Sequence, residues 1–187
     1  SNSEVLDIKI LTIFDSSYPE ALRGIVDYPS VLYCKGNIHL LNDVRSIAVV
    51  GSREVHERLT EDFDQILSGI ENLPNSCIVS GLAIGTDSLA HRYALKNNIA
   101  TIAVMPCGLD KIVPSENKDL AYSILDGSGL LISEYPIGTN PTKSHFLNRN
   151  RIQSGLSTDV IIMQASEKSG TMTTFKRSSA RTGTATL

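Results

Sequence analysis

Short apolar runs alternate with amphipathic segments along most of the chain. Runs rich in Ile, Val and Ala predict buried strands, and they occur at residues 46–50, 77–80, 101–105, 130–133 and 159–163. The intervening segments carry apolar residues at helical spacing and predict helices near residues 56–72, 86–97, 115–126, 146–156 and 170–181. Strands that alternate with helices form parallel sheets covered by helices. The pattern therefore predicts an α/β fold with a mostly parallel sheet.

The first part of the chain lacks this alternation. Residues 15–23 could form a short helix, and residues 31–34 a short strand that ends at Gly36. We interpret residues 1–43 as an N-terminal lobe packed on the core, and residues 44–187 as the main domain. In this interpretation the last four residues begin a further strand that the chain does not complete.

The composition narrows the class of protein. The chain has 187 residues, of which 41% are hydrophobic, enough for one domain with a sizeable core. No apolar stretch approaches about 20 residues and no secretory pattern opens the chain, so we expect a cytoplasmic protein with no membrane contact. The three cysteines and four histidines show no metal-ligand spacing, so we expect neither a metal nor a cofactor.

The charges are unevenly distributed. The net charge is −3, but residues 140–187 hold seven basic and two acidic side chains, whereas residues 1–139 hold 10 basic and 18 acidic ones. Such asymmetry can mark an anionic partner. The alternative is that the basic residues form a solvated helix face.

Four of the predicted strands stop at glycine turns, which contain Gly51-Ser52-Arg53, Ser80-Gly81 with Gly85, Pro106-Cys107-Gly108, and Ser169-Gly170-Thr171. Parallel sheets place their ligand crevice at the C-terminal ends of the strands, so the four turns should line one edge. Glycine lets backbone N–H groups approach an anion, and helix N-termini favour negative charge. The arrangement predicts a site for a phosphorylated ligand.

The first turn offers the clearest anion site. Gly51 permits close approach, the Ser52 hydroxyl can donate, and Arg53 can act as a bidentate phosphate ligand. The structural alternative is a glycine turn with a surface arginine. Neither the Walker A pattern nor the GxGxxG fingerprint is present.

The second and fourth turns open predicted helices. Thr86 or Asp87 can cap the helix that follows Ser80, Gly81 and Gly85. His91 shares a helix face with Asp87, and we favour a structural role because no nucleophile partner is evident. At the fourth turn, Ser169, Gly170 and Thr171 resemble a phosphate-binding turn, with Lys168 beside them.

Basic and aromatic residues follow the long loop at residues 134–144. Arg149 and Arg151 flank Asn150, and because they are two residues apart they do not share a helix face. Phe146 could stack on a base or fill the core, and for an isolated Phe we favour the core. For Glu134 we favour a salt bridge to an arginine of the crevice.

Taken in order, these segments resemble the DNA-processing protein A family (DprA, also called Smf). The resemblance covers roughly residues 18 to 183 and rests on several segments, which include Tyr28-Pro-Ser-Val-Leu32, Val49-Val-Gly-Ser-Arg53, Val79-Ser-Gly-Leu-Ala-Ile-Gly-Thr-Asp87, Ser133-Glu-Tyr-Pro136, Arg149-Asn-Arg151, Ser154-Gly-Leu-Ser157 and Ser169-Gly-Thr171. The sequence departs from the family at Ile84, where the family often has a basic residue. The family also continues beyond the last residues of this chain through another strand, and it usually carries further domains.

The resemblance implies a Rossmann-like three-layer domain that binds single-stranded DNA and catalyses no reaction. The family protects incoming strands during natural transformation and loads a RecA-type recombinase on them, and it commonly forms homodimers. In the family the position of Arg53 contacts DNA, and the signature matched by Arg149-Asn150-Arg151 lies near the same pocket.

A second hypothesis is a nucleotide-binding sensor or a nucleoside-monophosphate-processing enzyme of a related Rossmann-like family. Lys168-Ser169-Gly170-Thr171 occupies the place of a nucleotide-binding turn in those hydrolases. The double glycine of that turn is missing, and no glutamate follows Thr171. These differences argue against the hydrolase and leave nucleotide binding open.

Overall fold

A single mixed sheet organises the molecule. The computed structural model describes residues 7–55, 57–165, 173–179 and 185–186. Within these residues, nine strands pair in the order β1-β2-β6-β5-β4-β3-β7-β8-β9. The five central strands run parallel, and they are β6 (Leu130–Ser133), β5 (Ala100–Val104), β4 (Ser76–Ser80), β3 (Arg45–Gly51) and β7 (Asp159–Ala165). The predicted α/β fold with its mostly parallel core is thus confirmed.

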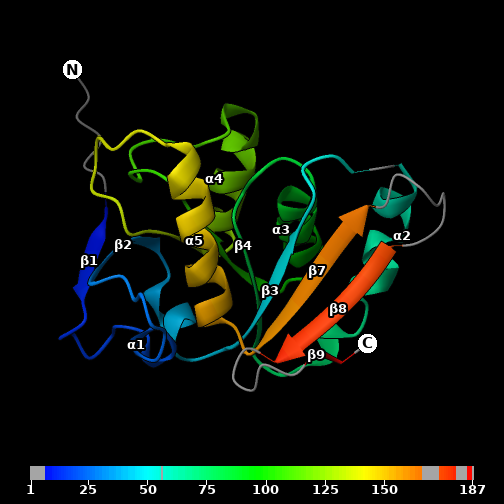
Figure 1. Ribbon diagram of the computed structural model, residues 1–187, viewed down its shortest axis with the longest axis horizontal. Coiled ribbons are helices and arrows are strands. Elements are labelled where there is room, and N and C mark those ends of the chain that lie inside the picture. Colours follow the sequence, from blue (N-terminus) through cyan, green and yellow to red (C-terminus); the bar gives the residue numbers. More distant parts are fainter. Residues whose placement is uncertain (1–6, 56, 166–172, 180–184, 187) are drawn as a thin grey trace.

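Helices cover both faces of the sheet. One face carries α5 (Lys143–Leu156), α1 (Glu20–Arg23) and the 3-10 turn η1 (Ile38–Leu41). The other face carries α2 (Glu57–Leu67), α3 (Thr86–Lys96) and α4 (Lys118–Asp126), with short 3-10 turns at Ile70–Asn72 and Ser115–Asn117. Figure 1 shows α5 in front of the sheet and α3 behind it. The three layers agree with the sequence-based prediction.

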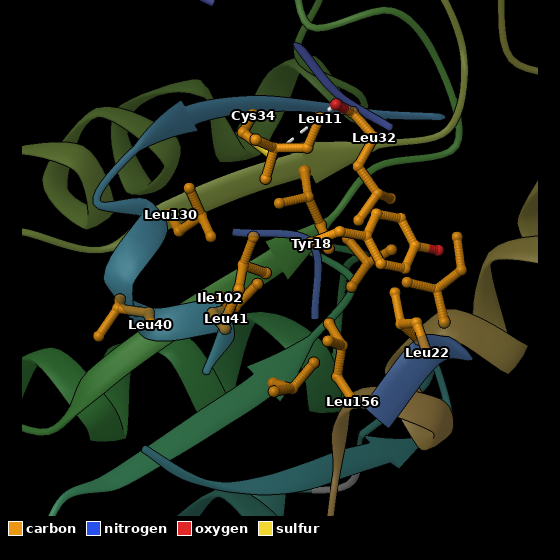
Figure 2. Close-up of a cluster of buried hydrophobic side chains, with 14 of the residues drawn as sticks. Leu11, Tyr18, Leu22, Leu32, Cys34, Leu40, Leu41, Ile102, Leu130 and Leu156 are labelled. Carbon is orange, nitrogen blue, oxygen red and sulfur yellow. Dashed lines mark hydrogen bonds between the residues drawn. The ribbon is translucent and has the colours of Figure 1, made fainter. Parts of the chain in front are cut away.

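The alternation of side chains along the strands divides the core. On β4, Cys77 and Val79 join the cluster under α5, whereas Ile78 packs on the α2–α3 side. Figure 2 shows the first cluster, where Tyr18 and Leu22 meet side chains from the central strands. Because both faces of these strands are buried, they are near-continuous apolar runs in the sequence.

The N-terminal residues extend the sheet. β1 (Lys9–Thr12) pairs antiparallel with β2 (Val31–Gly36), and β2 pairs antiparallel with β6. The segment expected as a lobe thus supplies strands to the main sheet, and its apolar residues share a cluster with the central strands. The helix expected over residues 15–23 keeps only its last turn, α1. Asp15 instead closes a turn by accepting the Thr12 N–H at 2.6 Å.

The prediction for the end of the chain was wrong in one element. Residues 173–179, expected within a helix, form β8 (Thr173–Ser179), which pairs antiparallel with β7. Without β8, β7 would be an edge strand with unpaired backbone groups, and this segment contains β-branched and aromatic residues that suit a strand. A two-residue strand, β9 (Ala185–Thr186), then pairs with β8.

The described residues contain neither a membrane-spanning helix nor a metal-binding cluster. No helix there is long and apolar enough to cross a membrane. No group of three His, Cys, Asp or Glu side chains is arranged to hold a metal ion among them. The three cysteines are free thiols, and all three are buried.

Candidate single-strand interface

A hollow lies where the C-terminal ends of β3 and β4 meet the middle of α5. Its volume is about 170 Å³, and we call it the α5 hollow. Five of the residues predicted to bind a ligand line it: Gly51, Arg53, Phe146, Arg149 and Asn150. The sheet edge named from the sequence therefore does contain a concave site, and α5 supplies half of its lining residues. Figure 1 shows α5 in front of β3 and β4.

The glycine turns after β3 and β4 pack against each other at this edge. The Thr86 N–H donates to the Ser52 carbonyl at 3.1 Å. Gly85 has φ +88°, and a Cβ there would lie 2.5 Å from the Arg53 carbonyl oxygen. Gly85 is thus required by the contact between the two turns as well as by its left-handed backbone. The first N–H group of α3 has a protein partner.

The predicted caps of α3 are wrong. Gly85 is the N-cap, and no side chain caps the helix. Asp87 accepts a hydrogen bond from the Ala83 N–H at 3.4 Å, and the Thr86 hydroxyl is buried with no partner in the described residues. The Ser52 hydroxyl accepts the Glu54 N–H at 3.1 Å. Asp87 and Ser52 thus stabilise the two turns by hydrogen bonds to backbone N–H groups.

Arg149 forms a buried ion pair beneath the turn after β4. Its Nη2 lies 3.0 Å from Asp87 Oδ2, and both side chains are less than one-tenth exposed (6% and 7%). A Cβ on Gly81 would lie 0.9 Å from Arg149 Nη1. Gly81 therefore leaves the space that the guanidinium fills. Ser80 lies below it, buried, with its hydroxyl donating to the Val49 carbonyl at 2.7 Å.

His91 lies on the same helix as Asp87 and is fully buried. Its Nδ1 is 2.8 Å from the Thr101 hydroxyl, which in turn donates to the Ile78 carbonyl. Burial, and then the charge of Arg149, lower the pKa of His91 to about 3. A neutral, buried imidazole that bonds to a strand confirms the structural role expected for this histidine.

Arg151 is not among the residues that line the hollow, and it joins three parts of the chain. Its guanidinium donates to Glu134 at 2.5 Å and to Asp27 at 3.0 Å. Burial opposes its charge, but the hydrogen bonds to the two carboxylates outweigh burial and raise the pKa of Arg151. The salt bridge expected for Glu134 is confirmed, but its partner, Arg151, is not one of the arginines that line the hollow.

Arg53 has a different environment from both helix arginines. It is exposed, and no ion pair involving it is found among the residues described. Its guanidinium carbon lies 5.0 Å from the centre of the Phe146 ring. Phe146 is half-buried and belongs to none of the apolar clusters, so the expectation that it fills the core was wrong. The two side chains form a cation–π pair at the hollow.

Five further lining residues did not figure among the predicted binding residues: Val50, Ala83, Asp87, Leu147 and Gln153. Gln153 carried a signal in the sequence, because it follows Arg149 by four residues and so shares its helix face. Leu147 is 72% exposed, and an exposed leucine carries no such signal.

The excess of basic side chains in residues 140–187 does not gather into a single patch among the described residues. Arg149 and Arg151 are paired with carboxylates, whereas Lys143 is exposed at the start of α5. The predicted phosphate turn at Lys168, Ser169, Gly170 and Thr171 lies outside the described residues. The unpaired positive charge among the lining residues of the hollow therefore comes from Arg53, and not from the arginines of α5.

The chain is similar to proteins of one known family. The model of the family described as DNA recombination-mediator protein A matches residues 9–182. The DNA processing protein DprA of Streptococcus pneumoniae is 42% identical over 89% of this chain and 57% of its own length. The protein Smf of Escherichia coli is 39% identical over 85% of this chain and 42% of its own. The chain thus spans about half the length of these relatives.

Two solved structures are similar to this one. The X-ray structure of the S. pneumoniae protein superposes with a TM-score of 0.79 at 42% identity, covering 88% of this chain and 56% of that one. A structure of DNA processing protein A from Helicobacter pylori has a TM-score of 0.75 at 34% identity, covering 89% of this chain and 73% of that one. The second is described as giving insight into a single-stranded DNA binding mode.

Proposed function

Because this chain belongs to the DNA recombination-mediator protein A family, we propose that it binds single-stranded DNA at the α5 hollow. Arg53 contacts the phosphate backbone, and Phe146 stacks on a base. The observation that carries the proposal is the pairing of the exposed Arg53 with the half-buried ring of Phe146, whose centre lies 5.0 Å from the guanidinium carbon, at the α5 hollow. Bound strands in non-specific complexes are held by this combination of cations and aromatic rings.

The other residues predicted to bind a ligand mainly support Arg53 and Phe146. Gly51 and Gly85 bring the two turns together and so fix the backbone that carries Arg53. Gly81 leaves the space for Arg149, Ser80 holds the end of β4 by its bond to the Val49 carbonyl, and Arg149 and Asn150 line the hollow. Lys168, Ser169, Gly170 and Thr171 remain a proposed second phosphate contact.

The two candidate acid–base groups near the described site are engaged by protein partners, which supports a binding protein rather than an enzyme. Asp87 is held by Arg149, and His91 is buried against Thr101. Asp87 lines the hollow, but its carboxylate is engaged by the guanidinium, and His91 is not among the lining residues, whereas general acid–base chemistry requires a group within reach of the reacting proton.

We further propose the cellular role that the family name suggests. The protein would act in the cytoplasm on strands that enter during natural transformation, protect them, and load a RecA-type recombinase on them. A homodimer would let two hollows hold one strand, and such bivalent binding raises affinity without new contacts. These roles concern full-length proteins, of which this chain spans about half.

The test is a fluorescence-anisotropy titration of labelled oligo-dT at two salt concentrations, with a duplex of the same length alongside. We expect salt-sensitive binding of the single strand, weaker binding of the duplex, and loss of binding in Arg53→Ala. Arg92→Ala is the matched control, because Arg92 is exposed on α3, across the sheet from α5. Equal binding by the two variants would refute the site. A saturable thermal shift with a mononucleotide, without strand binding, would favour a nucleotide sensor.

A further inference from the structure

One polar side chain at the α5 hollow has no protein partner. Gln153 is 1% exposed and lines the hollow, and neither its Oε1 nor its Nε2 forms a hydrogen bond with any described residue. Most buried side-chain polar atoms in proteins have a partner. Gln153 therefore brings to the lining of the hollow an amide whose donor and acceptor are both unused among the described residues.

The surroundings of this amide limit what it can bind. Arg149 Nε is also buried without a partner, and Arg149 lines the hollow one turn before Gln153. The remaining lining includes the apolar side chains of Val50, Ala83 and Phe146. The lining thus combines apolar side chains with the Gln153 amide, and its buried charges, Asp87 and Arg149, are paired with each other. Such a lining suits a flat, uncharged ring that carries its own donor and acceptor. The volume of about 170 Å³ is below the roughly 300–1,000 Å³ of pockets for drug-sized ligands, so it suits one ring system.

We propose that the Gln153 amide hydrogen-bonds to the Watson–Crick edge of one unpaired base of the strand. This inference rests on the proposed function and adds the group that distinguishes a free base from a paired one. Every DNA base has a donor and an acceptor next to each other on that edge. A primary amide has the complementary pair and can present it in either order by turning over. Gln153 thus accepts any base, provided that its edge is free.

Two consequences follow for recognition. The site accepts a strand of any sequence, because the Gln153 amide can turn over to match the donor and acceptor of each base. The site rejects duplex, because a paired base has no free Watson–Crick edge, and an unmet donor and acceptor would remain buried in the hollow. Phosphate contacts alone would not give this second property, since duplex DNA also carries phosphates.

The test uses Gln153→Met, which keeps an unbranched side chain of similar length and removes both hydrogen-bonding atoms. The probes are oligo-dT and an oligonucleotide of the same length built from N3-methylthymine, whose Watson–Crick donor is blocked. We expect the unaltered protein to prefer oligo-dT by about tenfold. Gln153→Met should bind both probes equally, at the level of the methylated one. Gln65→Met, an exposed glutamine on α2, is the control and should keep the preference.

The outcomes separate this inference from the proposed function. If oligo-dT binds, depends on Arg53, and shows no preference over the methylated probe, the amide has no role and the inference is overturned alone. If oligo-dT does not bind, the proposed function fails with it. A second readout is thermal unfolding. Because the amide has no protein partner, Gln153→Met should unfold at the same temperature or higher, and a clear decrease would contradict the inference.

Discussion

Two arginines at one hollow have opposite environments. Arg149 is buried against Asp87 under a turn that must be glycine, and with Gly81 and His91 we call this the buried arginine cluster. Arg53 is exposed, forms no ion pair with the described residues, and lies over the ring of Phe146. We call Arg53 and Phe146 the exposed arginine pair. Both arginines match family motifs. A motif therefore does not distinguish an arginine that stabilises the site from one that is free to bind.

The difference has an electrostatic cause. A buried guanidinium has lost its water, so it needs Asp87 nearby, and removing either partner leaves a charge that the interior cannot solvate. An exposed guanidinium keeps its water and can exchange it for a phosphate. Mutations in the two regions should accordingly affect different properties of the protein, and four changes test this separation.

The largest effect is expected in the buried arginine cluster. Arg149→Ala leaves Asp87 buried without its partner and should lower the free energy of unfolding by about 3–5 kcal/mol. Urea denaturation followed by circular dichroism measures this. Arg92→Ala, on the surface of α3, should change stability by no more than about 0.5 kcal/mol. A similar small change in Arg149→Ala would show that the ion pair does not stabilise the fold.

The exposed arginine pair should affect binding and leave stability unchanged. Arg53→Ala removes a hydrogen bond to a charged group, worth about 1.5–3 kcal/mol, so the affinity for oligo-dT should fall at least tenfold. The slope of affinity against salt concentration should decrease by about one. Anisotropy titrations over a salt series give both quantities. An unchanged slope would mean that Arg53 contacts no phosphate.

The buried arginine cluster should also make stability depend on pH. The pKa of His91 is about 3 in the folded protein and about 6.5 when unfolded, so the unfolded state binds the proton between these values. The contribution of His91 to the free energy of unfolding is complete above pH 6.5. It decreases as the pH falls, by about 2 kcal/mol at pH 5. Urea titrations at pH 7 and pH 5 measure the change. His91→Gln does not titrate and should lose less stability over this range, and parallel behaviour would contradict the assignment.

The smallest effect separates the two members of the exposed arginine pair. Phe146→Ala removes a stacking surface worth at least about 1 kcal/mol per base, so affinity should fall about fivefold or more. The salt slope should stay the same, because no charge is lost. Phe146→Leu keeps an apolar side chain and should recover little of the loss. A full recovery would indicate simple packing rather than stacking.

Much of the fold could be predicted from the sequence because the central strands are buried on both faces. Each is a continuous apolar run, and the helices between them have apolar faces. β8 could not be predicted in this way, because its strand character depends on pairing with β7, which otherwise would lie at the edge. α5 begins one turn before its prediction, where Thr142 accepts the His145 N–H.

The site was less predictable, because its contacts join distant parts of the chain. The burial of Arg149 depends on Asp87, 62 positions earlier, and on the space above Gly81. Spacing along the helix correctly indicated that Arg149 and Arg151 would face apart, but it gave neither partner. The exposure of Phe146 likewise follows from the geometry of α5 over the sheet, which an isolated Phe in a sequence does not reveal.

The most direct test places a reporter at the hollow. The chain contains no tryptophan, so Phe146→Trp introduces a single indole beside Arg53, and Phe14→Trp places one at a side chain that is 90% exposed and lies outside the hollow. If the strand binds at the hollow, oligo-dT should quench Phe146→Trp fluorescence with the midpoint seen by anisotropy, and the signal should vanish when Arg53→Ala is added. Phe14→Trp should not respond. Binding by anisotropy with no change in Phe146→Trp would place the strand elsewhere and contradict the account.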